Sequence, residues 1–181
     1  PPSEGGSSSL LVRLTRNCPW NRCAFCAMYK HHKFTVRPVD EIKKEIDTMA
    51  AIAHELQQIS HDLGYPGTIA REAAIVLLNK EPLLNQHEGF VMLFNWLISG
   101  AKTAFLQDAN SLIMKTDQLV EVLQHLRRTF TSVSRVTSYA RAKTLVQKSA
   151  AELERIRKAG LDRLHVGLES GDDTLLKGIK K

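Results

Sequence analysis

The chain has 181 residues, of which 43% are hydrophobic and 24% are charged. This composition can bury the core of a globular domain and excludes a disordered tail. No stretch approaches the roughly 20 apolar residues that cross a bilayer, and residues 1–9 lack the layout of a signal peptide, so we expect a cytoplasmic protein with no membrane partner. The net charge is +6, but the basic residues are mixed with Asp and Glu, which disfavours nucleic acid as a partner without excluding it.

The first third of the chain predicts a strand, a polar loop and a long helix. Residues 1–9 contain several Gly and Ser and are expected to be a flexible N-terminal segment, whereas the apolar run 10–14 predicts a buried strand. Three cysteines follow directly. Pro38 suits a first helical turn, and apolar residues then recur at helical spacing as far as Gly64, which predicts one long amphipathic helix.

An inserted helical pair is predicted at about 66–100. Helical patterns lie around 69–79 and 88–99, and Pro82 and Asn85 between them are helix breakers.

The rest of the chain alternates strands with helices. Strands are predicted at 103–106, 133–138 and 164–168, and helices at 116–126 and 149–160. The second of these helices begins with a capping-box pattern and ends at a glycine. Alternating elements predict right-handed crossovers and a parallel sheet, so the expected fold class is α/β.

A cluster of polar residues follows each predicted strand. The four clusters lie at 18–26, 107–111, 138–141 and 169–173. The loops at the carboxyl ends of parallel strands meet at one edge of the sheet and commonly carry the chemistry. The four clusters therefore predict one shared site.

The three cysteines, Cys18, Cys23 and Cys26, lie within nine positions of one another. Their number and spacing argue against a disulfide framework and for ligation, since iron–sulfur clusters and zinc prefer thiolates. Zinc would need a fourth ligand, for which His31 and His32 are the nearby candidates. A plant-type ferredoxin shares the C-x4-C-x2-C spacing but requires a fourth cysteine, which this chain does not have. Three unrelated packed cysteines are a further alternative.

A strand, a three-cysteine loop with the aromatic Phe25 directly before the last cysteine, and subsequent βα repeats together resemble the radical S-adenosylmethionine (radical SAM) superfamily. A narrower resemblance, to a bacterial subgroup of undefined reaction, is carried by the segments 14–33, 105–112, 137–144 and 167–173. The usual family spacing is C-x3-C-x2-C, so this chain has one extra residue in the first interval. The resemblance covers nearly the whole chain after Ser9.

The resemblance implies a partial (βα) TIM-like barrel of the radical SAM type, in which 10–181 is the N-terminal part of the core domain and further strands follow. It implies an enzyme in which Cys18, Cys23 and Cys26 hold a 4Fe-4S cluster that binds S-adenosylmethionine at its open iron. In the family, an electron from a reductant such as flavodoxin or ferredoxin then cleaves S-adenosylmethionine to a 5′-deoxyadenosyl radical, which abstracts hydrogen from the substrate. The substrate of this chain is unidentified.

The same resemblance implies contacts to the S-adenosylmethionine molecule. Phe25 would lie against the adenine, and Glu169 would accept hydrogen bonds from the ribose hydroxyls. Ser138 and Arg141 would meet the carboxylate, for which a guanidinium fork is well suited.

The ammonium group of S-adenosylmethionine calls for acceptors, which Gln107, Asp108 and Asn110 can supply. Judged from the residues alone, Asn110 could instead cap a turn, Phe25 could be a packing residue and Arg141 could pair with an acidic side chain. The alternative to an enzyme is a zinc- or iron–sulfur-binding domain for interaction or electron transfer.

Overall fold

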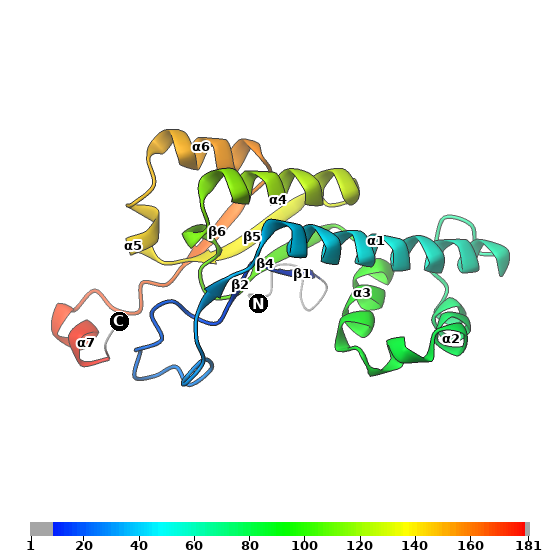
Figure 1. Ribbon diagram of the computed structural model, residues 1–181, viewed down its shortest axis with the longest axis horizontal. Coiled ribbons are helices and arrows are strands. Elements are labelled where there is room, and N and C mark those ends of the chain that lie inside the picture. Colours follow the sequence, from blue (N-terminus) through cyan, green and yellow to red (C-terminus); the bar gives the residue numbers. More distant parts are fainter. Residues whose placement is uncertain (1–8, 180–181) are drawn as a thin grey trace.

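Four parallel strands form the centre of the molecule (Figure 1). The structure is a computed structural model and describes residues 9–179. The strands are β1 (Leu10–Arg13), β4 (Thr103–Gln107), β5 (Arg135–Ala140) and β6 (Arg163–Val166), in the spatial order β1-β4-β5-β6. Every neighbouring pair is parallel, which confirms the predicted α/β class and parallel sheet.

One face of this sheet is covered by helices (Figure 1). They are α1 (Val39–Asp62), α4 (Thr116–Thr129) and α6 (Ala150–Lys158). Alternate strand residues point to this face, so their apolar side chains pack against the apolar stripes of the helices and form the core. The long helix predicted over 38–64 is confirmed.

The other face of the sheet carries three neighbouring rings. The ring centroids of Phe105 and Tyr139 lie 4.9 Å apart, and those of Tyr139 and His165 lie 6.1 Å apart. Phe105 is buried, whereas Tyr139 is exposed. This face is therefore apolar at its centre and open toward β5 and β6.

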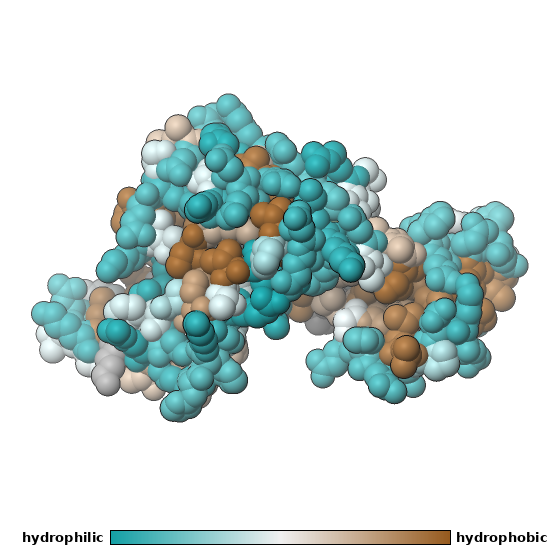
Figure 2. All heavy atoms as spheres, in the orientation of Figure 1, coloured by the Kyte–Doolittle hydropathy of each residue, from teal (hydrophilic) through white to brown (hydrophobic). Residues whose placement is uncertain are grey.

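The predicted helical pair is confirmed as α2 (Arg71–Lys80) and α3 (Glu88–Ile98), joined by the 3-10 helix η1 (Pro82–Gln86). The two helices lie beside the C-terminal half of α1 (Figure 1). Figure 2 shows apolar side chains gathered over this lobe, which exposes Ile75, Leu83 and Val91.

The sequence did not predict several short elements. Two of them, β2 (Thr15–Arg16) and β3 (Thr35–Val36), pair antiparallel and close the cysteine loop. The others are η2 (Ser111–Ile113) and α5 (Ala142–Leu145). Elements of two to four residues show too little periodicity to stand out in a sequence. The last described helix is α7 (Asp173–Gly178), where residues 174–181 have a helical pattern.

The predicted last strand was too long at its carboxyl end. Strand β6 stops at Val166, and Leu168 is 78% exposed. Beyond the strand, Glu169 adopts a φ of 64°, and the Ser170 amide turns back to the Leu168 carbonyl. A residue with positive φ cannot continue a strand, so the alternating pattern ends here.

The predicted capping box at the start of α6 is confirmed. The Ser149 hydroxyl accepts from the Glu152 amide at 3.2 Å, and the Glu152 carboxylate accepts from the Ser149 amide at 2.9 Å. Hydrogen bonds from the Ser149 amide, the Thr116 hydroxyl and the Ser149 hydroxyl lower the pKa of Glu152 to about 2.

Within residues 9–179, none of the helices combines the length and the apolar character needed to span a bilayer. The segment 1–9, expected to be flexible, lies outside the described residues except for Ser9.

Candidate functional site

The cysteine loop occupies residues 17–34, between β2 and β3, at the carboxyl end of β1 (Figure 1). The antiparallel pairing of β2 with β3 places Thr15 opposite Val36 and Arg16 opposite Thr35. Both ends of the loop are therefore held together. The chain is also fastened to the sheet just before the loop, because the Leu14 amide donates to the Gln107 carbonyl at 2.6 Å.

Polar contacts brace the loop from within. Asn17 and Asn21 adopt positive φ angles of 68° and 48°, a conformation that asparagine tolerates better than most residues. The Lys30 ammonium donates to the carbonyls of Asn21 and Cys23 at 3.1 and 3.0 Å. The Asn21 side-chain amide donates to the Tyr29 carbonyl at 2.5 Å. These contacts fold the second half of the loop back onto the first.

The three cysteine thiols are partly exposed, and none is in a disulfide. The Cys18 sulfur accepts from the Asn21 amide at 3.5 Å, and the Cys26 amide donates to the Cys23 carbonyl at 3.4 Å. Across residues 9–179, no three or more His, Cys, Asp or Glu side chains are grouped so as to hold a metal ion. Ligation by all three cysteines would therefore need the loop to draw their sulfurs together.

The chemistry of the loop nevertheless fits an iron–sulfur cluster. Segment 17–34 supplies three thiols and contains no Asp or Glu, while Arg22, Lys30 and Lys33 are basic. Basic surroundings offset the negative charge of a thiolate-bound cluster. The histidines proposed as zinc ligands, His31 and His32, are both exposed and belong to no metal-holding group either.

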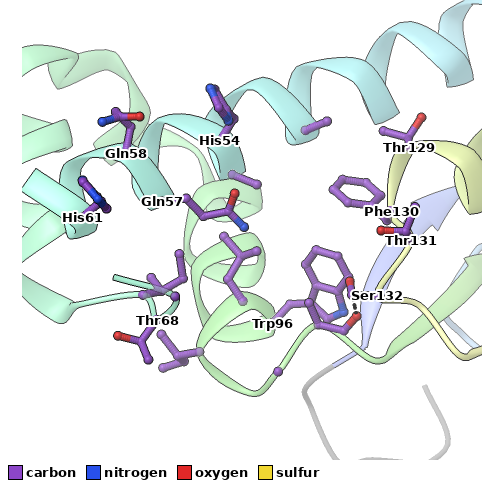
Figure 3. A pocket seen from close by; sticks show the side chains of 18 residues that line it. His54, Gln57, Gln58, His61, Thr68, Trp96, Thr129, Phe130, Thr131 and Ser132 are labelled. Carbon is purple, nitrogen blue, oxygen red and sulfur yellow. Dashed lines mark hydrogen bonds between the residues drawn. The ribbon is translucent and has the colours of Figure 1, made fainter. Parts of the chain in front are cut away.

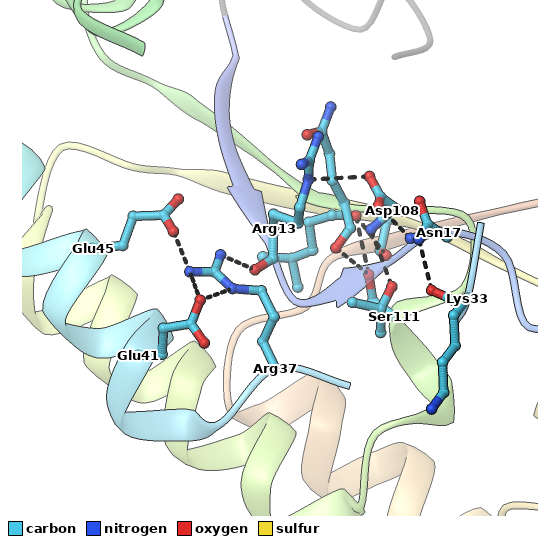
Figure 4. Close-up of polar contacts among 12 residues, drawn as sticks. Arg13, Asn17, Lys33, Arg37, Glu41, Glu45, Asp108 and Ser111 are labelled. Atoms are coloured by element: carbon cyan, nitrogen blue, oxygen red, sulfur yellow. Dashed lines mark hydrogen bonds and ion pairs between the residues drawn. The ribbon is translucent and has the colours of Figure 1, made fainter. Parts of the chain in front are cut away.

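Asp108 follows β4 and contacts Asn17 at the start of the loop (Figure 4). It is 7% exposed and joins Gln107 through a cis peptide bond. Its carboxylate accepts from the Asn17 amide at 2.9 Å and lies 3.4 Å from the Arg13 guanidinium. Burial and the nearby charge of Asp108 raise the pKa of Tyr29 to about 12.

Arg37, which follows β3, ties the other side of the loop to the sheet (Figure 4). Its guanidinium is buried and donates to the Arg13 carbonyl at 2.7 Å. It also forms ion pairs with Glu41 at 2.8 Å and Glu45 at 2.5 Å on α1. The positive charge of Arg37 is thus compensated by two carboxylates, as a buried charge requires. The role of Arg37 could not be predicted from the sequence.

Ser138 lies within β5, because the strand predicted to end at 138 runs to Ala140, whereas Asn110 lies in the loop after β4. The Ser138 hydroxyl is fully buried and donates to the Leu106 carbonyl at 3.1 Å. The Asn110 amide group donates to the Thr144 hydroxyl at 2.7 Å, and its oxygen accepts from the Arg141 amide at 3.3 Å. Both side chains therefore have partners inside the protein rather than facing an open surface.

Arg141 stacks on Trp20 of the cysteine loop. The guanidinium carbon of Arg141 lies 4.5 Å from the Trp20 ring centroid, and that of Arg22 lies 5.3 Å from it. Among the described residues, Arg141 forms no ion pair with Asp or Glu, so the acidic partner considered from the sequence is not seen. Trp20 was not predicted as a residue of the site, although it lies between Cys18 and Cys23.

The other residues predicted to contact S-adenosylmethionine are Phe25, Gln107 and Glu169. Phe25 is 56% exposed, so it is not a core packing residue. Gln107 is partly buried and lines a groove of about 570 Å³ beside β1 together with Arg13. Glu169 lies in the exposed turn after β6. The segment that follows this turn returns to the cysteine loop, where the Ala24 amide donates to the Ile179 carbonyl at 2.8 Å.

A larger cavity of about 900 Å³ lies elsewhere, between α1, α3 and the turn 129–132 (Figure 3). Ala101 and Ser132, which precede β4 and β5, line it, so it belongs to the amino edge of the sheet, opposite the cysteine loop. Figure 3 shows Gln57 pointing from α1 toward the rings of Trp96 and Phe130. None of the lining residues is Asp, Glu, Lys or Arg. This cavity is not part of the candidate site.

No protein-family model matches the chain, and neither a curated protein nor a solved structure shows significant similarity to it. The functional assignment therefore rests on the chemistry of the site itself. That site is a braced cysteine loop at the carboxyl edge of a parallel sheet, with Asp108 in contact with its start and Arg141 beside it.

Proposed function

We propose that this chain is part of a radical SAM enzyme, in which Cys18, Cys23 and Cys26 would hold a 4Fe-4S cluster. One observation carries the proposal. Three partly exposed thiols, free of disulfides, share a basic loop at the carboxyl edge of an all-parallel sheet. That edge is where α/β proteins place their chemistry. When bound, such a cluster supplies the electron that cleaves S-adenosylmethionine reductively.

The four-stranded sheet supports a finer proposal, a partial TIM-like barrel of the radical SAM type. Its strands are parallel, they follow one another in chain order across the sheet, and helices cover one face. These features are shared with (βα) barrels, in which the other face is the interior. Phe105, Tyr139 and His165 would then belong to the interior.

The residues of the site divide into two roles under this proposal. Arg141, whose guanidinium is stacked on Trp20, would bind the carboxylate of S-adenosylmethionine through its N–H edge. Phe25 and Glu169 are exposed and remain candidates for contacts to adenine and ribose. Ser138 would act indirectly, by linking β5 to β4, and Asn110 by linking the segments that follow these two strands.

Anaerobic reconstitution of the purified chain with iron and sulfide tests the proposal. We expect about four iron ions per chain and the broad visible absorbance of an iron–sulfur cluster. A variant with all three cysteines changed to serine should take up none. The matched control is His31→Ala combined with His32→Ala, which should leave iron uptake unchanged. Under dithionite with excess S-adenosylmethionine, we expect 5′-deoxyadenosine.

The outcomes separate the alternatives. Binding of one zinc ion per chain, lost in the histidine variant and accompanied by no iron uptake, would indicate a zinc-binding domain and not an enzyme. A stable cluster that never yields 5′-deoxyadenosine would favour electron transfer. A physiological reductant such as flavodoxin or ferredoxin and a cytoplasmic location belong to the same proposal as radical SAM chemistry.

A further inference from the structure

We infer that Asp108 is a positioning residue, whose carboxylate holds the two ends of the Cys18–Cys26 segment against the sheet. The inference rests on the proposed function, in which this segment supplies the ligands of a cluster. It gives Asp108 a role different from the contact to an ammonium group that the family resemblance implied.

The carboxylate of Asp108 reaches residues on both sides of the cysteines. On one side it accepts from the backbone amide of Asn17, the residue before Cys18, at 2.9 Å. On the other side Tyr29, three residues after Cys26, is close enough to this carboxylate for Asp108 to contribute to the raised pKa of its hydroxyl. The backbone of Asp108 adds a third link, since its amide donates to the Thr15 hydroxyl at 3.3 Å. One side chain therefore spans the segment that contains all three thiols.

The charge of Asp108 makes these links strong. The side chain is 6% exposed, so water screens it little, and the Arg13 guanidinium 3.4 Å away compensates its charge. Hydrogen bonds accepted by an ionised, buried carboxylate are roughly twice as strong as those between neutral groups. Arg13 belongs to β1 and Asp108 follows β4, so the pair also joins two neighbouring strands at the edge that carries the loop.

Burial argues against Asp108 as a direct ligand contact. Asn17, Arg13 and Tyr29 already surround its oxygens, and a ligand ammonium would have to displace them. Such a displacement would release the loop whose thiols the same ligand needs. A carboxylate in this position is better suited to hold the loop than to bind substrate.

Amide hydrogen exchange on the metal-free full chain tests the inference without any cluster. Asp108→Asn keeps the shape of the side chain and removes its charge. We expect the amides of Asn17, Asn21 and Cys26 to exchange roughly tenfold faster, because a charge-assisted hydrogen bond is lost. Amides of β5 should keep their protection. Asp47→Asn is the matched control, since Asp47 lies on α1 and pairs with His125 far from the loop.

Two results would overturn the inference. Exchange at the three loop amides could be the same in Asp108→Asn as in Asp47→Asn, in which case Asp108 holds nothing there. Alternatively, Asp108→Asn could lose protection equally in the loop and in β5, in which case Asp108 supports the whole sheet and does not act on the loop.

Tyr29→Phe provides a second, milder variant if Asp108→Asn does not fold. It keeps the ring and removes only the hydroxyl close to Asp108. We expect faster exchange at Cys26 and Lys30, with Asn17 still protected. Unchanged exchange at all three positions would show that the second end of the segment is not held, against the inference.

The cluster gives a separate readout. After anaerobic reconstitution, we expect a chelator to remove iron about tenfold faster from Asp108→Asn than from Asp47→Asn, with equal thermal midpoints. Equal release rates would contradict a positioning role. If the unsubstituted chain takes up no iron at all, the proposed function fails, and the exchange data alone then decide whether Asp108 holds the loop.

Discussion

The guanidinium of Arg141 forms a cation–π contact with Trp20, with 4.5 Å between its carbon and the ring centroid. Trp20 belongs to the cysteine loop and Arg141 follows β5. This contact therefore joins two of the four polar clusters, which are far apart in the sequence. A cation over an aromatic face is attracted to the electrons of the ring. The contact therefore links the cysteine loop to the segment that follows β5.

Replacing Arg141 should loosen Trp20. A cation–π contact at a half-exposed position stabilises by about 0.5–1 kcal/mol. In an Arg141→Ala variant on a Trp96→Phe background, we expect acrylamide to quench Trp20 fluorescence about twofold more strongly. Arg128→Ala, on the exposed side of α4, is the control and should leave quenching unchanged. Equal quenching in both variants would show that the contact does not hold the ring.

Gly160 should tolerate no side chain. Its φ is +115°, and a Cβ there would lie 2.6 Å from the Arg127 Nε, whose guanidinium donates to the carbonyls of Gly160 and Val133. We expect Gly160→Ala to lower the free energy of unfolding in urea by about 1–3 kcal/mol. The control is Gly89→Ala in α3, where nothing lies within 4 Å of the added Cβ. That change should be neutral or stabilising by up to about 1 kcal/mol.

Trp96 should be sensitive even to a conservative change. The ring is 1% exposed, and its N–H donates to the Thr103 carbonyl at 2.8 Å, which fixes α3 to the start of β4. Trp96→Phe leaves that carbonyl without its donor and removes buried volume, so we expect a loss of about 2–4 kcal/mol in chemical denaturation. Ile75→Ala, at a position 62% exposed on α2, should change stability by no more than about 0.5 kcal/mol.

The capping box of α6 should contribute a pH-dependent term to stability. The pKa of Glu152 is lowered from 4.5 to about 2 in the folded chain, so its stabilising effect is complete above pH 4.5 and is lost as the pH falls toward 2. We expect the difference in unfolding free energy between the unsubstituted chain and Glu152→Gln to shrink over that range. Glu154→Gln, on the same helix outside the capping box, is the control. A difference that stays constant from pH 7 to pH 2 would contradict the assignment.

The longer helices and strands could be predicted because their apolar residues recur periodically and their ends carry recognisable residues. The helix after Pro38, the helical pair around Pro82 and the capping box at Ser149 all gave local signals, and the structure confirms them. The β2–β3 ribbon gave none, since its pairing of two residues on each side depends on chain closure and not on periodicity.

The candidate site could be predicted in position but not in detail. The order of strands and loops was sufficient to bring Cys18, Asp108 and Arg141 to one edge of the sheet. What each side chain contacts there depends on residues distant in the sequence, such as Trp20 for Arg141 and Asn17 for Asp108. Ser138 was predicted at the end of its strand but lies inside β5, so its burial against the Leu106 carbonyl could not be predicted.

The pairing of β2 with β3 bears on how the loop would capture a metal ion. With both ends of 17–34 fixed, the three thiols cannot diffuse apart and remain at a high effective concentration with respect to one another. Under the proposed function, Cys18, Cys23 and Cys26 would then act as ligands within one molecule. Part of the entropy of bringing the three thiols together would be lost during folding and not during metal binding.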